Sequence, residues 1–166
     1  MKKLSALIML GVLVYAGISA TELTLENYQA RSLDEEKIVK LVLDYQEAYN
    51  LYDSKGILAV YLPGAIIKAG VKDDWSEHVV TKEEYSGILA DKLTKWKMYS
   101  FKLRFFTPNK INVEGSNAKL NVPFMIYSIA QDYWEKGIFN FDFRKADSGW
   151  LISKNMWEVV DLFYTP

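Results

Sequence analysis

The stretch from Ser32 to Gly70 constrains the fold most, because it predicts two helices and a strand in close succession. Ser32 and Glu35 have the Ser-x-x-Glu spacing of a capping box, which marks the start of a helix. Apolar side chains then recur every three or four residues, which places them on one helical face: Ile38, Leu41, Val42, Tyr45, Ala48, Tyr49 and Tyr52. The pattern predicts a long amphipathic helix that ends near Tyr52 and packs against a core.

A short second helix and a strand are expected directly after the first helix. Asp53 or Ser54 can cap the second helix. Pro63 should end it, because the residue before a proline is disfavoured in the helical region. The dipeptide Pro63-Gly64 predicts a turn, followed by a strand over residues 65–68. The buried side of this helix is expected to hold Ile57, Leu58 and Tyr61.

The remainder of the chain predicts a polar loop, a third helix and a run of strands. Residues 70–79 are expected to form the loop, and Thr81 with Glu84 forms a second capping box before the third helix. After Tyr99, alternation of apolar and polar residues and turn-forming breaks predict strands near 100–106, 110–114, 118–130, 134–146 and 149–160. Helices gathered ahead of a run of antiparallel strands indicate an α+β fold with the helices on one face of the sheet.

The N-terminus predicts an exported protein. Lys2 and Lys3 precede an apolar run, and small residues follow, as in a secretory signal peptide over residues 1–20. Cleavage is expected after Ala20, with Ala16 as a second candidate. The location would then be periplasmic or secreted. The alternative is an uncleaved segment that anchors the chain to a membrane, which would be the protein's sole membrane contact.

Two further segments follow the expected signal peptide. Residues 21–31 are expected to form a polar lead-in, and residues 32–166 a single domain.

Composition excludes several classes of site. The chain has no Cys, which removes disulfides and thiolate chemistry, and its one His, His78, rules out a multi-His metal centre. The formal net charge is −1, so no basic surface is expected for nucleic acid. No nucleotide-binding glycine motif occurs. No cofactor, metal ion or nucleic-acid partner is therefore expected.

Four segments resemble the nuclear transport factor 2-like superfamily: DYQEAYNLYDSKGILAVYLPGAII, TKEEYSGILADKL, INVEGSNAKL and FRKADSGWLISKNMW. The resemblance covers about residues 32–160. Within the superfamily, the chain is similar to exported SnoaL and ketosteroid isomerase-like domain proteins. It implies a cone-shaped pocket between three helices and a curved, mostly antiparallel sheet. It also implies a homodimer through the outer face of the sheet. It says little about chemistry, because this fold carries many functions.

Ketosteroid isomerase, a member of this superfamily, provides a residue-by-residue test. Its chemistry requires a general base and an oxyanion hole made by a Tyr and a protonated Asp. Matching the segments places Tyr45 at the oxyanion Tyr, Ala69 at the general base and Phe141 near the protonated Asp. Without a base in reach of the proton, this activity is not expected.

The resemblance and the aromatic content together predict a small apolar or aromatic ligand in the cone. The candidate ligand-binding residues are Tyr45, Tyr49, Tyr61, Trp75, Trp96, Tyr127, Phe141 and Trp157. Each could instead be a core residue. One alternative is a lyase or isomerase that uses Tyr45 or Tyr49 with a base from Asp142 or from residues 73–78. A second alternative is an interaction module whose own side chains fill the cone.

Overall fold

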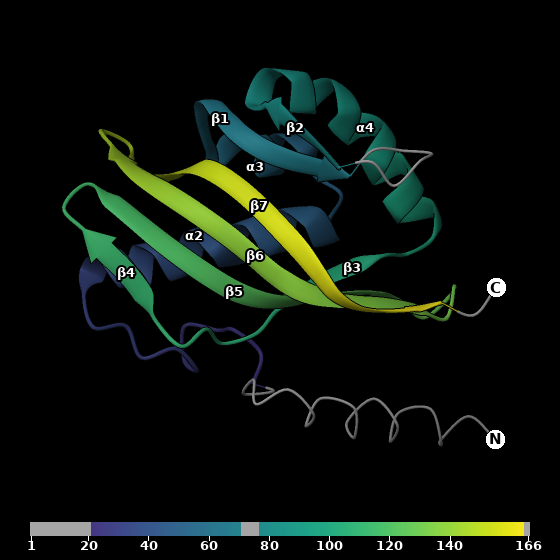
Figure 1. Cartoon of the computed structure of the whole chain (residues 1–166), viewed down its shortest axis with the longest axis horizontal. Helices are drawn as coiled ribbons and strands as arrows, with labels where there is room; N and C mark the ends of the chain where they lie inside the picture. The colour runs from purple at the N-terminus through teal and green to yellow at the C-terminus, as the bar shows by residue number, and fades with distance from the viewer. Residues whose placement is uncertain (1–20, 71–76, 165–166) are drawn as a thin grey trace.

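The computed structural model describes residues 21–70 and 77–164, so the expected signal peptide and the candidate Trp75 lie outside the described residues. Within these ranges the helices α2 (Leu33–Asn50), α3 (Ser54–Ala59) and α4 (Lys82–Met98) pack against one face of a curved, unclosed sheet (Figure 1). The expected α+β fold with three helices on one face of the sheet is confirmed.

Among the described residues the sheet has seven strands: β1 (Tyr61–Gly70), β2 (Glu77–Thr81), β3 (Lys102–Phe105), β4 (Ile111–Glu114), β5 (Asn117–Ser128), β6 (Tyr133–Ala146) and β7 (Gly149–Tyr164). Their order is β2-β1-β7-β6-β5-β3, and β4 also pairs with β5. All neighbours are antiparallel except β1 and β7. The C-terminal strand therefore lies inside the sheet and joins the β1–β2 hairpin to the long strands (Figure 1).

Helix α2 begins as its sequence predicts, with a different partner for Glu35. The Ser32 hydroxyl accepts a hydrogen bond from the backbone N–H of Glu35. The Glu35 carboxylate turns to Arg31, accepting from its backbone N–H at 2.8 Å and from its guanidinium at 2.6 Å. That guanidinium also donates to the carbonyl of Ile111 in β4. Since Glu35 is only 4% exposed, this contact fixes the start of α2 against the sheet.

The region around Pro63 differs from its prediction. Pro63 and Gly64 do not form a turn after a helix; they lie inside β1, and Tyr61 belongs to this strand rather than to the second helix. Gly64 has φ +67, which glycine adopts without steric cost. The pairing with β7 shifts register between Tyr61 and Ile66, so the strand continues through an irregularity. The expected loop over residues 70–79 is wrong at both ends, because Gly70 lies in β1 and residues 77–79 lie in β2; residues 71–76 lie outside the described residues.

Two further irregularities bend the long strands around the helices. The β6–β7 pairing shifts between Lys136 and Gly137 and again between Asp142 and Phe143. Each shift adds a residue to β7, which bends the strand and increases its twist. At the first shift the strands approach so closely that a Cβ on Gly137 would lie 1.9 Å from the Glu158 carbonyl oxygen. The sheet thus curves where the helices cover it.

Aromatic side chains fill the space between the sheet and α2. Phe139, Phe141 and Phe143 alternate with more exposed residues along β6, so one face of this strand is aromatic. Tyr45 of α2 packs edge-on against Phe141, with ring centroids 5.7 Å apart, and stacks on Phe105 at 6.2 Å. None of the helices in the described part of the chain is both long and apolar enough to cross a bilayer.

Candidate ligand-binding cavity

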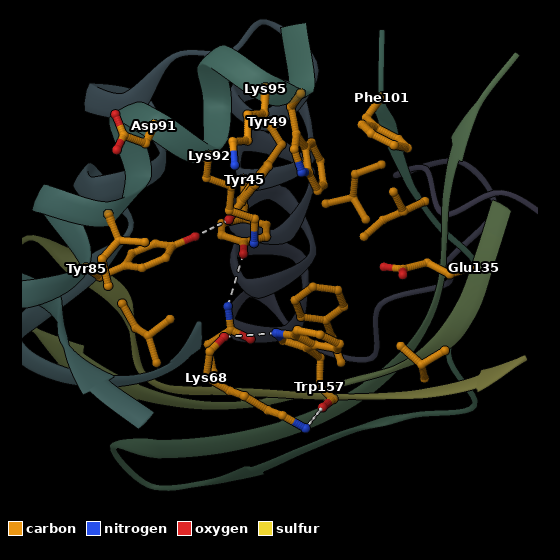
Figure 2. A pocket seen from close by; sticks show the side chains of 18 of the residues that line it. Tyr45, Tyr49, Lys68, Tyr85, Asp91, Lys92, Lys95, Phe101, Glu135 and Trp157 are labelled. Atoms are coloured by element: carbon orange, nitrogen blue, oxygen red, sulfur yellow. Dashed lines mark hydrogen bonds between the residues drawn. The ribbon is translucent and has the colours of Figure 1, made fainter. Parts of the chain in front are cut away.

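A cavity of about 960 Å³ lies between the helices and the inner face of the sheet. Its volume is at the upper end of the range for small-molecule sites. Helices α2 and α4 supply Tyr45, Tyr49, Tyr85 and Trp96, and strands β6 and β7 supply Phe139 and Trp157 (Figure 2). The wall is largely apolar and aromatic, and its polar groups are a cluster of phenols with an asparagine, a glutamate, and charged side chains from α4 and β1.

The first polar place is a hydrogen-bonded cluster of four tyrosines and one asparagine, which we call the phenol cluster: Tyr45, Tyr49, Tyr61, Tyr85 and Asn155. The Asn155 amide donates to the hydroxyl of Tyr45 at 3.0 Å and of Tyr61 at 2.6 Å. Tyr61 also donates to Tyr45 at 3.3 Å, and the hydroxyls of Tyr49 and Tyr85 share a short hydrogen bond. Burial raises the pKa of all four phenols, so they stay protonated at neutral pH.

Asn155 is incompletely paired within this cluster. It is 1% exposed, and its Oδ1 atom has no hydrogen-bond partner among the described residues. Buried amide oxygens are normally satisfied, because an unpaired one costs about 1–3 kcal/mol. An unpaired buried oxygen is tolerated where the rest of the same side chain makes contacts that hold it in place. Here the amide orients two phenols, one of which lines the cavity.

The second polar place is Glu135 on β6, across the cavity from the phenol cluster (Figure 2). Its Oε2 atom accepts a hydrogen bond from the Tyr133 hydroxyl at 2.5 Å. Removal from water raises the pKa of Glu135, and this effect outweighs the opposing hydrogen bond from Tyr133 and the charge of Lys92. The cavity therefore contains a carboxylate that is only partly compensated.

Lysine side chains add positive charge to the aromatic wall. The Lys92 ammonium lies 5.4 Å from the centre of the Trp96 ring and 5.9 Å from that of Tyr49. The Lys68 ammonium lies 4.9 Å from the Trp157 ring and donates to the Trp157 carbonyl at 2.7 Å. These cation–π contacts hold the lysine stems along the wall of the cavity.

The structure places the candidate ligand-binding residues in three groups. The first group lines the cavity: Tyr45, Tyr49, Trp96 and Trp157. Tyr61 lies behind the wall, hydrogen-bonded to Tyr45 and Asn155. Phe141 is buried in the core without lining the cavity, and Tyr127 lies on the opposite face of β5 from the lining residue Ile126. Whether the lining residues bind a ligand stays a prediction.

Most of the lining residues were not among the sequence candidates, and these include Tyr85, Phe139, Glu135 and Asn155. Tyr85 and Phe139 follow the expected inner faces of their elements, so their periodicity indicated burial but not a cavity. Asn155 could not be found this way. Counting alternate residues from Ile152 points Lys154 inward, whereas the irregularity beside Asp142 reverses the alternation and buries Asn155.

Of the bases considered for an enzymatic function, Asp142 does not line the cavity. Asp142 alternates with the buried Phe141 and Phe143 and so lies on the other face of β6. Of the acidic loop, residues 73–76 lie outside the described residues. The position matched to the general base, Ala69, lies in β1, paired through its backbone with His78. Within residues 21–70 and 77–164, no group of three or more His, Asp or Glu side chains could hold a metal ion.

Solved structures similar to this chain share its fold at low sequence identity. A Xanthomonas campestris protein, named for a proposed calcium/calmodulin-dependent protein kinase II association domain, is 13% identical with a TM-score of 0.65, covering 84% of this chain and 94% of its own. A proposed aromatic ring hydroxylase from Novosphingobium aromaticivorans is 16% identical with a TM-score of 0.61, covering 82% and 96%. A nuclear transport factor 2-like protein of unknown function from Shewanella oneidensis is 19% identical with a TM-score of 0.57, covering 74% and 96%. No protein-family model and no curated protein sequence matches the chain.

Proposed function

We propose that this chain, which has the nuclear transport factor 2-like fold, binds a small apolar or aromatic molecule in its cavity. The observation that carries the proposal is a hollow of about 960 Å³ walled by aromatic side chains, with polar groups at its two sides. A cone filled by its own side chains, as in a purely structural module, would leave no such volume. Apolar walls with a few convergent polar groups are typical of small-molecule sites.

The phenol cluster supports a ligand that accepts a hydrogen bond. Its four hydroxyls and one amide carry about six donor hydrogens, two on the amide and one on each phenol. Four hydrogen bonds join these groups. Even if Tyr45 also donates to Tyr49, one hydroxyl hydrogen remains, and Tyr45, Tyr49 and Tyr85 all line the cavity. A carbonyl or carboxylate oxygen on the ligand would accept it.

Binding is preferred over catalysis because, among the described residues, no carboxylate or imidazole is hydrogen-bonded to the phenol cluster. The Tyr45 hydroxyl contacts Tyr61 and Asn155, and neither side chain is a base at neutral pH. Glu135 lies on the opposite side of the cavity. A lyase or isomerase that used Tyr45 or Tyr49 would need its base within hydrogen-bond reach of the same substrate atom or its neighbour.

The proposed cellular location of the protein rests on its N-terminal sequence. We propose that the protein is exported to the periplasm or secreted after removal of residues 1–20, which mass spectrometry of the exported chain would test through its N-terminal mass. A homodimer through the outer face of the sheet is the proposed assembly, and light scattering coupled to gel filtration would measure its mass.

The binding proposal can be tested with two probes that differ only in whether they carry a ketone oxygen. 2-Acetylnaphthalene carries an aromatic ketone, and 2-isopropenylnaphthalene has a methylene in place of the ketone oxygen. Isothermal titration calorimetry should show tighter binding of the ketone by about 2- to 12-fold, because one neutral hydrogen bond contributes about 0.5–1.5 kcal/mol. Tyr45→Phe and Tyr85→Phe should each reduce this preference.

Tyr127→Phe is the matched control, since it removes a phenol hydroxyl from the opposite face of the sheet. Its ketone preference should equal that of the wild type. Equal binding of the two probes by the wild-type protein would contradict the hydrogen-bonding role of the phenol cluster. The absence of binding for both probes, and for any molecule retained in native mass spectrometry, would contradict the binding function itself.

A further inference from the structure

The Glu135 carboxylate has one free oxygen that faces the cavity. Its Oε2 atom accepts from the Tyr133 hydroxyl, and its Oε1 atom has no hydrogen bond among the described residues. No described lysine or arginine lies within ion-pair distance of it. Figure 2 shows the carboxylate directed into the cavity, opposite Tyr45 and Tyr85. The side chain is half-buried, so it has lost part of its hydration.

Other desolvated carboxylates of this chain are paired more fully. Glu35 receives two hydrogen bonds from the Arg31 side chain and one from its backbone N–H. Asp34 receives hydrogen bonds from the ammonium of Lys145 and from the indole of Trp150. A carboxylate held away from water with a single phenol partner retains acceptor capacity that the protein itself does not use. A ligand in the cavity can use it.

We propose that Glu135 is a second polar subsite, which accepts a hydrogen bond from a hydroxyl group on the ligand; the inference rests on the binding function proposed above. The donor is a neutral hydroxyl rather than an ammonium group. Lys92 lines the same cavity, and its positive charge already acts on Glu135. A cationic ligand at Glu135 would be repelled by the Lys92 ammonium.

The two subsites together define a ligand class. The phenol cluster donates to a carbonyl or carboxylate oxygen, and Glu135 accepts from a hydroxyl on the opposite side of the cavity. Phe139 and Trp157 line the space for the body of the molecule. The ligand is therefore an apolar, ring-containing compound with a hydrogen-bond acceptor at one end and a hydroxyl at the other.

The test uses acetylnaphthalenes with one hydroxyl placed in turn at each free ring carbon, each compared with the analogue that carries a methyl group at the same carbon. Calorimetry with the mature protein should find at least one position where the hydroxyl binds about tenfold more tightly than the methyl. Scanning all positions removes the need to know the distance between the two subsites. Glu135→Leu should abolish that gain, and Glu135→Gln, which keeps a neutral acceptor, should retain part of it.

Two controls separate loss of the subsite from loss of the fold. Glu158→Gln removes an exposed carboxylate from the neighbouring strand and should keep the full gain. Unchanged affinity of Glu135→Leu for unsubstituted 2-acetylnaphthalene shows that its cavity is intact. If the parent ketone binds and no hydroxyl exceeds its methyl counterpart, or if the gain survives in Glu135→Leu, the Glu135 subsite is refuted while the binding function stands. If the wild type binds none of these probes, the Glu135 subsite is refuted, and the binding function falls with it when native mass spectrometry also retains no molecule.

Discussion

Gly137 marks the point where β6 and β7 approach most closely, and Gly137→Ala tests whether this contact shapes the sheet. An added Cβ would lie 1.9 Å from the Glu158 carbonyl oxygen, 2.9 Å from its carbonyl carbon and 2.6 Å from the Phe124 ring. Ordinary contacts of a Cβ begin at 3.4 Å, so a backbone strand must move by about 1.5 Å. The obstacle is backbone of a central strand, which cannot swing aside as a side chain can.

The expected cost follows from this geometry. Overpacking a well-packed interior costs about 1–3 kcal/mol, and displacement of paired backbone belongs at the upper end, about 3 kcal/mol. For a chain of this length each kcal/mol lowers Tm by about 2–4 °C, so Gly137→Ala should lower Tm by about 6–12 °C. Differential scanning calorimetry and urea unfolding would measure the change.

Gly87→Ala is the matched control, because the same methyl group is added to an exposed position within α4 where nothing lies within 4 Å. Alanine is favoured over glycine inside a helix by about 0.8–1 kcal/mol, so this variant should raise Tm by a few degrees. The opposite signs of the two variants separate steric conflict from a general effect of alanine. A Tm of Gly137→Ala within about 2 °C of the wild type would refute the reasoning.

Two further predictions concern pH. Because the pKa of Glu135 is raised on folding, the folded state binds more protons than the unfolded state above about pH 4.3, and stability falls as the pH rises through the folded pKa. In urea unfolding, the free energy of unfolding of Glu135→Gln minus that of the wild type should therefore increase as the pH rises from about 4.3 through the folded pKa of Glu135. A difference that stays constant with pH would contradict this prediction. Burial raises the pKa of Glu35, but the hydrogen bonds from Arg31 lower it by more, so the folded pKa lies below the unfolded one. The contribution of Glu35 to the stability of the fold is therefore present above about pH 4.3 and is lost as the pH falls through the folded pKa. Glu35→Gln should be less stable than wild type by about 1–2 kcal/mol at pH 7, and a gap that persisted at pH 2 would be inconsistent with this account.

The sequence predicted the elements well where local signals agree with the tertiary structure. Thr81 caps α4 through a complete capping box, and the strands after Lys102 lie within a few residues of their expected bounds. The prediction failed at Pro63, where turn chemistry suggested a chain reversal. The structure places the same two residues inside an irregular strand, because pairing with β7 supplies hydrogen bonds that no local rule anticipates.

The candidate site was predictable only in its apolar part. Tyr45 and Tyr49 follow the helical period of α2, and that period indicates which face is inward. Asn155 follows a register shift that adds a residue to β7, and a shift of one residue exchanges the two faces of a strand. Glu135 instead keeps the alternation of Phe139 and Phe141 along β6. Alternation therefore could not locate Asn155, and for Glu135 it indicates the face of the strand but not that this face borders a cavity.

The position of β7 in the sheet has a consequence for how the chain folds. β7 is last in sequence among the described strands, yet it pairs with β1 on one side and β6 on the other. The β1–β2 hairpin can join the long strands only after residues 149–164 have been synthesised, so the sheet forms by contacts between the two ends of the domain. Such long-range pairing slows folding. Nascent chains that stop before Gly149 should leave the β1 edge unpaired and open to proteases or to chaperones.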